Sequence, residues 1–156
     1  TRHTAVDLRE TMIRTVVMAS LVALTWHPPI PVGADQTLPP CPDSPNCVST
    51  DATRASQRVP TVPFPDAPAA ALRRAKAALL AESRTTVTIE REGYLHAECR
   101  SLVFRFVDDV DLVVDSVAHV YRFRSASRIG RSDLGVNRKR IARISARLAL
   151  PPTTSK

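Results

Sequence analysis

The middle of the chain has an apolar pattern with a period of two, and this pattern limits the possible folds more than any other feature of the sequence. In TTVTIERE, which begins at Thr85, alternation puts Val87 and Ile89 on one face. In the next segment, YLHAECR, one face consists of Leu95, Ala97 and Cys99. This alternation is typical of strands with one buried face, so we expect two strands in succession.

Two further apolar segments follow, SLVFRFVDDVDLVVD and VAHVYRFRSAS. In the last segment we expect Ala118 and Val120 to face the core. Short turn signals separate the segments, first at Gly93 and later at Asp115-Ser116. Because strands joined by short turns pair with their neighbours in the chain, the sequence predicts a four-stranded antiparallel meander.

A helix is predicted on each side of the meander. Asp66 followed by Pro68 is typical of a helix start, and residues 69–82 contain good helix formers at helical spacing. A second helix follows the last strand, with Asp133 or Asn137 as its cap. Its apolar stripe consists of Leu134, Ile141, Ile144 and Leu148. The predicted fold class is α+β: a two-layer sandwich in which the meander is flanked by an N-terminal and a C-terminal helix.

The length of 156 residues suits one domain with extensions. Residues 66–150 form the predicted α+β domain, and residues 151–156 form a tail. Residues 35–65 are rich in proline, lack periodicity and contain a cysteine pair, so we interpret them as an extended arm. The arm is expected to lie over the domain, and the second face of the sheet is either exposed or partly covered by the arm.

We interpret residues 1–34 as an upstream extension followed by a signal peptide or an N-terminal anchor. The apolar run TVVMASLVALTW at 15–26 follows Arg14 and is too short to span a bilayer comfortably. The small residues at 32–34 predict cleavage after Ala34, and an uncleaved membrane anchor is the alternative. Both outcomes predict an exported domain that is periplasmic, secreted or anchored on the extracytoplasmic side.

The three cysteines bear on redox chemistry and metal binding. Cys41 and Cys47 enclose the loop CPDSPNC, and in an oxidising compartment a disulfide is the default for such a close pair. A zinc site is disfavoured, because neither a second close cysteine pair nor a His-x3-His spacing follows. Cys99 is interpreted as a small buried hydrophobic residue. The sequence predicts no metal and no cofactor.

The segment RSASRIGRSDLGVNRKR at 124–140 places arginines among small residues. Arginine binds a carboxylate or phosphate through two parallel hydrogen bonds, and serine hydroxyls add donors. The N terminus of the helix that follows favours an anion as well. We therefore expect a site for a small anion or an anionic lipid headgroup. The candidate ligands are Arg124, Ser125, Ser127, Arg128, Asn137 and Arg138.

The alternative is that these arginines form internal ion pairs and that the chain is a structural or protein-interaction module. Three acids lie on the neighbouring predicted strand, Asp108, Asp109 and Asp111, and a fourth, Asp133, lies within the basic segment. Alternation puts Asp109 and Asp111 on one face of the sheet and Asp108 on the other. The three acids of the strand therefore cannot all serve one site.

The net charge of +7 favours an anionic partner. Nucleic acid is disfavoured by the predicted export and by the lack of aromatic residues among the basic ones, on which bases would stack. Membrane association is compatible with the basic polar side of the last predicted helix. A hydrolase-like enzyme is a third hypothesis. No catalytic residues are assigned, because His96 and Cys99 should point to opposite faces and no GxSxG or HExxH motif occurs.

Four motifs, in order, resemble a known family. They are CPDSPNCVST at 41–50, YLHAE at 94–98, FVDDVDL at 106–112 and RSASRIGRSDLGVNRKRI at 124–141. Together they resemble the bacterial and plastid family catalogued as domain of unknown function 1499, over nearly all of residues 41–148. The resemblance implies a protein that is often exported or membrane-linked, and it supplies no catalytic residues. Asp111 stands where the family more often has glutamate, which preserves the charge.

Overall fold

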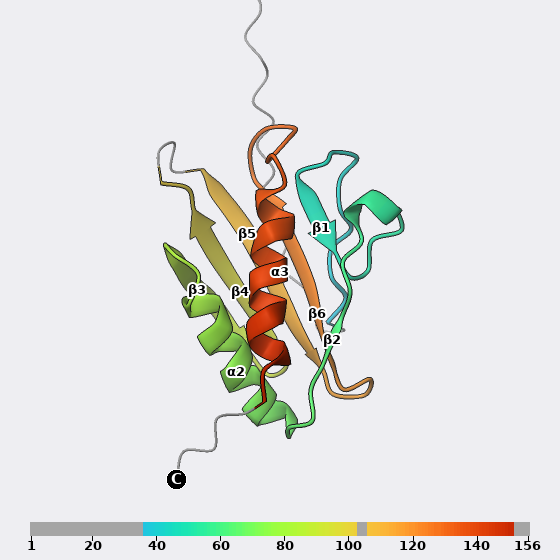
Figure 1. Cartoon of the computed structure of the whole chain (residues 1–156), viewed down its shortest axis with the longest axis vertical. Coiled ribbons are helices and arrows are strands. Elements are labelled where there is room, and N and C mark those ends of the chain that lie inside the picture. Colours follow the sequence, from blue (N-terminus) through green and yellow to red (C-terminus); the bar gives the residue numbers. More distant parts are fainter. Residues whose placement is uncertain (1–35, 103–105, 152–156) are drawn as a thin grey trace, which may run out of the picture.

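The computed structural model describes residues 36–102 and 106–151 (Figure 1). The predicted leader lies outside the described residues, and so do its apolar run at 15–26 and its cleavage site after Ala34. Within the two described ranges, none of the helices combines the length and the apolar character needed to cross a membrane.

A six-stranded antiparallel sheet forms one layer of the structure (Figure 1). Its strands are β1 (Cys47–Ser49), β2 (Val62–Pro63), β3 (Thr85–Arg91), β4 (Tyr94–Arg100), β5 (Val107–Asp115) and β6 (Val120–Ser127). The order in space is β1-β6-β5-β4-β3, and β2 also pairs with β6. The predicted α+β class and the meander from β3 to β6 are confirmed. The predicted count of four strands is too low, because the arm supplies β1 and β2.

The arm joins the sheet by pairing with β6. In β1, Val48 aligns with Ser125, and in β2, Val62 aligns with Tyr121. A short 3₁₀ helix, η1 (Ala55–Gln57), lies between the two strands in the chain. Strands of two and three residues are too short to show a period, which is why the sequence pattern indicates an irregular arm here.

Two α-helices, α2 (Pro68–Leu80) and α3 (Val136–Ala149), lie on the same face of the sheet (Figure 1). The predicted cap of the first helix is wrong. Ala67 occupies the N-cap position and makes no side-chain cap, while the carboxylate of Asp66 pairs with Arg74 of the same helix. The nearby guanidinium therefore takes the carboxylate that was expected to bind the first N–H groups of the helix.

Gly135 occupies the N-cap position of α3, so neither of the two predicted caps does. Leu134 lies before it and is largely exposed, so only three residues of the predicted stripe are buried: Ile141, Ile144 and Leu148. Of the two predicted caps, Asp133 satisfies free N–H groups at the helix start. Its carboxylate accepts from Gly135 at 3.0 Å and from Asn137 at 2.7 Å. The side chain of Asn137 is fully buried and bonds elsewhere.

The main core lies between the sheet and the two helices. Leu95, Ala97 and Cys99 face it, as the alternation in β4 predicts. The prediction that Val87 and Ile89 share a face is wrong. A register shift between them turns Val87 toward the main core and Ile89 toward a smaller cluster on the opposite face.

In β6 the inward residues are Tyr121 and Phe123, so the predicted inward position of Val120 and Ala118 is wrong. The hydroxyl of Tyr121 donates to the carbonyl of Ala71 in α2 at 3.0 Å. Two large aromatic side chains bury more apolar surface than a valine and an alanine would. This difference decides which alternate residues of β6 face the core. The same alternation decides on which face of the sheet the residues of the basic segment within β6 lie.

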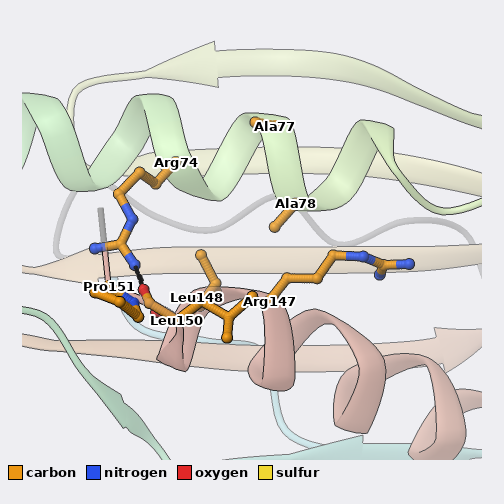
Figure 2. A pocket seen from close by; sticks show the side chains of 7 residues that line it. All are labelled: Arg74, Ala77, Ala78, Arg147, Leu148, Leu150 and Pro151. Carbon is orange, nitrogen blue, oxygen red and sulfur yellow. Dashed lines mark hydrogen bonds between the residues drawn. The ribbon is translucent and has the colours of Figure 1, made fainter. Parts of the chain in front are cut away.

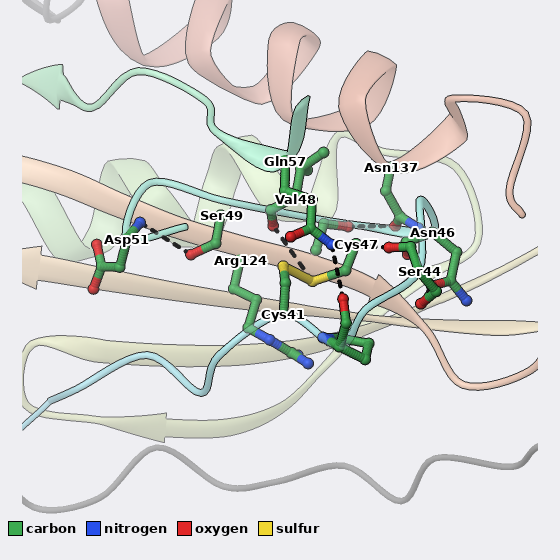
Figure 3. The surroundings of a disulfide bond; sticks show 12 residues. Cys41, Ser44, Asn46, Cys47, Val48, Ser49, Asp51, Gln57, Arg124 and Asn137 are labelled. Atoms are coloured by element: carbon green, nitrogen blue, oxygen red, sulfur yellow. Dashed lines mark hydrogen bonds between the residues drawn. A yellow bond between two sulfur atoms is a disulfide. The ribbon is translucent and has the colours of Figure 1, made fainter. Parts of the chain in front are cut away.

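A smaller apolar cluster lies on the opposite face of the sheet, beneath the first part of the arm. Leu38 packs there with Tyr94 and Val113. The disulfide between Cys41 and Cys47, whose Cα atoms are 5.6 Å apart, ties this part of the arm to β1 (Figure 3). The bond therefore holds the covering segment close to the sheet.

Replacing both bonded cysteines by serine (Cys41→Ser with Cys47→Ser) should lower the free energy of unfolding by about 2 kcal/mol, because the closed loop is short. Urea denaturation measures this change. Reductant should destabilise the natural chain to the same extent and leave the double-serine variant unaffected. Equal stability of the oxidised chain and the variant would show that the bond contributes nothing.

Candidate functional site

Three buried carboxylates on β5 dominate the polar structure of the sheet. Asp109 and Asp111 point to the face away from the helices, here called the outer face, and Asp108 points to the helix face. Less than a tenth of each residue is exposed. A buried carboxylate is costly unless charged or hydrogen-bonding groups surround it. Each of the three must therefore have partners.

On the outer face, His96 of β4 lies between two of these carboxylates. Its Nδ1 is 2.8 Å from Asp111 and its Nε2 is 3.2 Å from Asp109. The hydroxyl of Tyr94 also donates to Asp111, at 2.8 Å. Because both ring nitrogens of His96 face acceptors, the arrangement favours the imidazolium, which carries a hydrogen on each nitrogen.

Arg128 completes the charge balance of Asp109. Its Nε and Nη2 are 2.9 and 2.7 Å from the carboxylate, and Nη2 also donates to Glu98 at 2.6 Å. Arg124 makes a looser contact of 3.4 Å with Asp111, and its buried Nε has no partner among the described residues. We name this set the outer-face network: His96, Glu98, Asp109, Asp111, Arg124 and Arg128.

Each pKa shift resolved in this network favours the charged form of its group. Burial alone would lower the pKa of His96, but hydrogen bonds to Asp109 and Asp111 outweigh it and raise the pKa to about 9. Burial opposes ionisation of Asp109, yet hydrogen bonds from His96 and Arg128 lower its pKa below the ordinary value. Hydrogen bonds to Asp109 also raise the pKa of Arg128. His96, Asp109 and Arg128 are therefore charged at neutral pH.

On the helix face, Asn137 of α3 connects three segments of the chain (Figure 3). Its Oδ1 accepts from Ser125 at 2.6 Å, and its Nδ2 donates to Ser127 at 3.0 Å. The same Nδ2 donates to the carbonyl of Asn46, just before β1, at 3.0 Å. Because a buried amide must satisfy all its hydrogen bonds, this residue fixes α3 and the arm to β6 together.

Arg140, one turn later in α3, is the counterion of Asp108. Its Nη2 donates to the carboxylate at 2.6 Å, and its Nη1 donates to Ser125 at 3.1 Å and to Asn137 at 2.6 Å. All of these side chains are buried. The pair therefore joins α3 to β5 through the core side of the sheet.

The structure divides the six residues predicted to bind one anion among three places. Arg124 and Arg128 belong to the outer-face network. A second group bonds together on the helix face: Ser125, Ser127 and Asn137. Arg138 donates to the carbonyl of Arg58 at 3.0 Å and thereby holds the segment after η1 against α3. The six side chains do not converge on a common cavity.

Two important members of these networks are not apparent from the sequence pattern. His96 stands directly across from Asp111 in the β4–β5 register, and Glu98 stands across from Asp109. The register of the two strands is the signal that identifies both contacts. That Arg140 points toward the sheet can be deduced from the helical period only once the first residue of α3 is known. Asp133, predicted in the ion-pair network, instead binds N–H groups at that start.

A cavity of about 520 Å³ opens at the end of the sheet, where α2 ends and α3 begins. We name it the sheet-end pocket. Its acidic residues are Glu82 and Asp108. Its basic residues are Arg84, Arg100, Arg140, Arg143 and Arg147. The pocket therefore has a net charge of +3 from its lining side chains.

Within the pocket, the two acids are paired with three of the five arginines. Arg143 donates to Glu82 at 2.6 Å, and Arg147 pairs with the same carboxylate. Burial would raise the pKa of Glu82, but these two hydrogen bonds outweigh it and lower the pKa. Within the described part of the chain, both terminal nitrogens of Arg84 and one each of Arg143 and Arg147 make no hydrogen bond. These N–H groups are available to a ligand.

A second cavity, of about 370 Å³, lies between α2 and the C-terminal part of α3 (Figure 2). Arg74 on its wall donates to the carbonyls of Leu148 and Leu150 at 2.7 and 2.6 Å. These are carbonyls at the end of α3, which a guanidinium stabilises. The charge of Arg74 thus stabilises the helix end, and the rest of the wall between the helices is mainly apolar.

Metal binding and nucleophilic catalysis have little support in the described residues. Across 36–102 and 106–151, no group of three or more His, Cys, Asp or Glu side chains is placed to hold a metal ion. Cys99 and His96 lie on opposite faces of the sheet, and burial raises the pKa of the Cys99 thiol. A thiol with a raised pKa and no adjacent base is a poor nucleophile.

The stability of the fold should fall as the pH rises through the pKa of His96. The folded pKa of about 9 lies above the ordinary value of 6.5, so the stabilising charge is complete below pH 6.5 and is lost near pH 9. We expect the free energy of unfolding to decrease by on the order of 2 kcal/mol across that range. Urea denaturation at a series of pH values measures it.

Two variants separate this effect from general alkaline destabilisation. His96→Gln should remove most of the pH dependence between those values. His119→Gln, at an exposed histidine in the β5–β6 turn, should leave it unchanged. An equal slope in His96→Gln and the natural chain would contradict the assigned role of His96.

Comparison with known proteins agrees with the motifs described above. The model of the family described as "Protein of unknown function (DUF1499)" matches residues 37–148, which include all six strands and nearly all of α3. No curated protein and no solved structure matches the chain. The match covers well over half of the sequence, and the chain belongs to the DUF1499 family.

Proposed function

We propose that the chain is an exported, non-catalytic domain that binds a small anion in the sheet-end pocket. The ligand is a phosphate or carboxylate, either free or carried by the headgroup of an anionic lipid. The observation that carries the proposal is the charge of the pocket, where five arginines and two acids line a cavity of about 520 Å³. A concave site with an excess of one charge attracts ligands of the opposite charge.

The arrangement of the arginines adds to this support. Arg143 holds Glu82 through Nε and Nη2, and Arg147 holds it through Nη1. Each has one further terminal nitrogen without a bond to the residues that the structure describes. Arg84 has both terminal nitrogens without a bond in the described part of the chain. A guanidinium edge binds two oxygens of a phosphate or carboxylate in one plane.

A second candidate function is a structural or protein-interaction module without a ligand. It is favoured by the pairing of arginines from β6, from the segment after it and from α3 with acids inside the fold. Arg122 pairs with Asp51 at 2.8 Å, Arg128 with Asp109, and Arg140 with Asp108. These contacts engage the three arginines with internal acids, so the two candidates differ in what the sheet-end pocket does.

Anion titration of the purified domain distinguishes them. We expect inorganic phosphate, pyrophosphate or citrate to raise the melting temperature, because a ligand at 100 times its Kd adds about 2.7 kcal/mol of stability. The double variant Arg84→Gln with Arg100→Gln lowers the pocket charge and should weaken binding by roughly tenfold. Thermal shift as a function of anion concentration gives the affinity.

The matched control is Arg54→Gln with Arg73→Gln, which removes the same charge from exposed positions that do not line the pocket. It should bind as the natural chain does. If none of the anions shifts the melting temperature, the structural module is the better account. Equal weakening in both double variants would mean that net charge, and not the pocket, governs binding.

A further inference from the structure

Three exposed apolar side chains lie around the sheet-end pocket. Leu102 and Val136 line it and are 73% and 44% exposed, and Leu134, two residues before Val136, is 87% exposed. Leu102 lies just after β4, Leu134 lies just before α3, and Val136 is the first residue of α3. The end of β4 and the start of α3 lie at the same end of the sheet (Figure 1). Exposed apolar residues beside a basic pocket form a surface of mixed character.

Leu134 also has an unusual backbone conformation, which bears on why its side chain is exposed. Its φ of 54° lies in the left-handed region, which bulky side chains rarely adopt. The hydrogen bonds from Gly135 and Asn137 to Asp133 hold the turn in place. Asparagine or glycine would suit this backbone at a lower energy and without exposing an apolar side chain. A leucine here is best explained by a partner that buries it.

We propose that this partner is the surface of an anionic lipid bilayer. The phosphate of one lipid headgroup occupies the sheet-end pocket, while Leu102 and Leu134 enter the boundary between headgroups and acyl chains. This inference rests on the proposed function, since the pocket provides the headgroup site. It goes further by identifying the ligand as part of a membrane surface.

The charges around the pocket complement such a surface. Arg84 and Arg100 on its rim are exposed, and so are Arg131 and Lys139 on either side of the Leu134 turn. Basic residues close to a membrane rich in anionic lipid add to its attraction for a protein, each by a small amount that salt weakens. The two acids of the pocket, Glu82 and Asp108, are already paired with arginines.

The surface suits a bilayer better than a protein. The core of a protein interface is a contiguous patch with few charges. Here the leucines come from two different connections, and five arginines line the pocket beside them. A bilayer interface accommodates isolated apolar side chains, and it accepts arginine and lysine because their stems are apolar and their charges reach the headgroups.

Vesicle binding tests the inference. We expect the domain to bind phosphatidylglycerol-containing vesicles, measured by cosedimentation, and to bind pure phosphatidylcholine vesicles at least tenfold more weakly. The variant Leu102→Ser with Leu134→Ser should lose about tenfold in affinity for the anionic vesicles. It should keep the thermal shift caused by soluble glycerol 1-phosphate, because the arginines of the pocket are intact.

The matched control is Val117→Ser with Leu150→Ser, two exposed apolar residues that do not line the sheet-end pocket, 93% and 62% exposed. This variant should bind anionic vesicles as the natural chain does. Equal loss in the control and the test variant would overturn the assignment of this surface.

The two proposals fail in different ways. Binding of glycerol 1-phosphate without binding of anionic vesicles overturns the membrane inference and leaves the anion site standing. The membrane inference is also overturned if Leu102→Ser with Leu134→Ser binds anionic vesicles with the affinity of the natural chain. A chain that binds neither glycerol 1-phosphate nor anionic vesicles contradicts both proposals.

Discussion

The structure depends on the pairing of three buried carboxylates that lie on a single strand. Because β5 is in the middle of the sheet, Asp108, Asp109 and Asp111 are largely removed from water, and alternation sends them to both faces. Each face therefore needs its own cations. The outer face takes His96, Arg124 and Arg128, and the helix face takes Arg140. A buried ion pair is costly to break, since removing one partner leaves an unpaired charge.

This requirement explains how the basic segment and the arm are arranged. Arg128 directly follows β6 and points to the outer face, whereas α3 covers the helix face and supplies Arg140 there. Asn137 then links α3 to Ser125 and Ser127 and to the backbone at Asn46, so the arm is fixed through the same cluster. What remains for a ligand is the arginine surface at the end of the sheet, where the charges exceed the internal acids.

The sequence predicts the meander, the two helices and the division of the β5 acids between faces, because these follow from periods of two and 3.6. It misses β1 and β2, which are too short to show a period, and it misplaces Ile89 because a register shift interrupts the alternation after Val87. The candidate site is less predictable. Which side chain of β4 lies beside Asp109 and Asp111 depends on the β4–β5 register. The sheet-end pocket is formed by segments that are far apart in the chain.

A double-mutant cycle on Asp109 and Arg128 tests the central claim most directly. Each single variant, Asp109→Asn and Arg128→Gln, should lower the free energy of unfolding by roughly 3 kcal/mol, because each leaves a buried charge without its partner. The double variant should lose much less than the sum, with a coupling energy on the order of 2 kcal/mol. Urea denaturation at neutral pH measures all four proteins. Additive losses would contradict the account, since Arg128 would then not act as the internal counterion of Asp109.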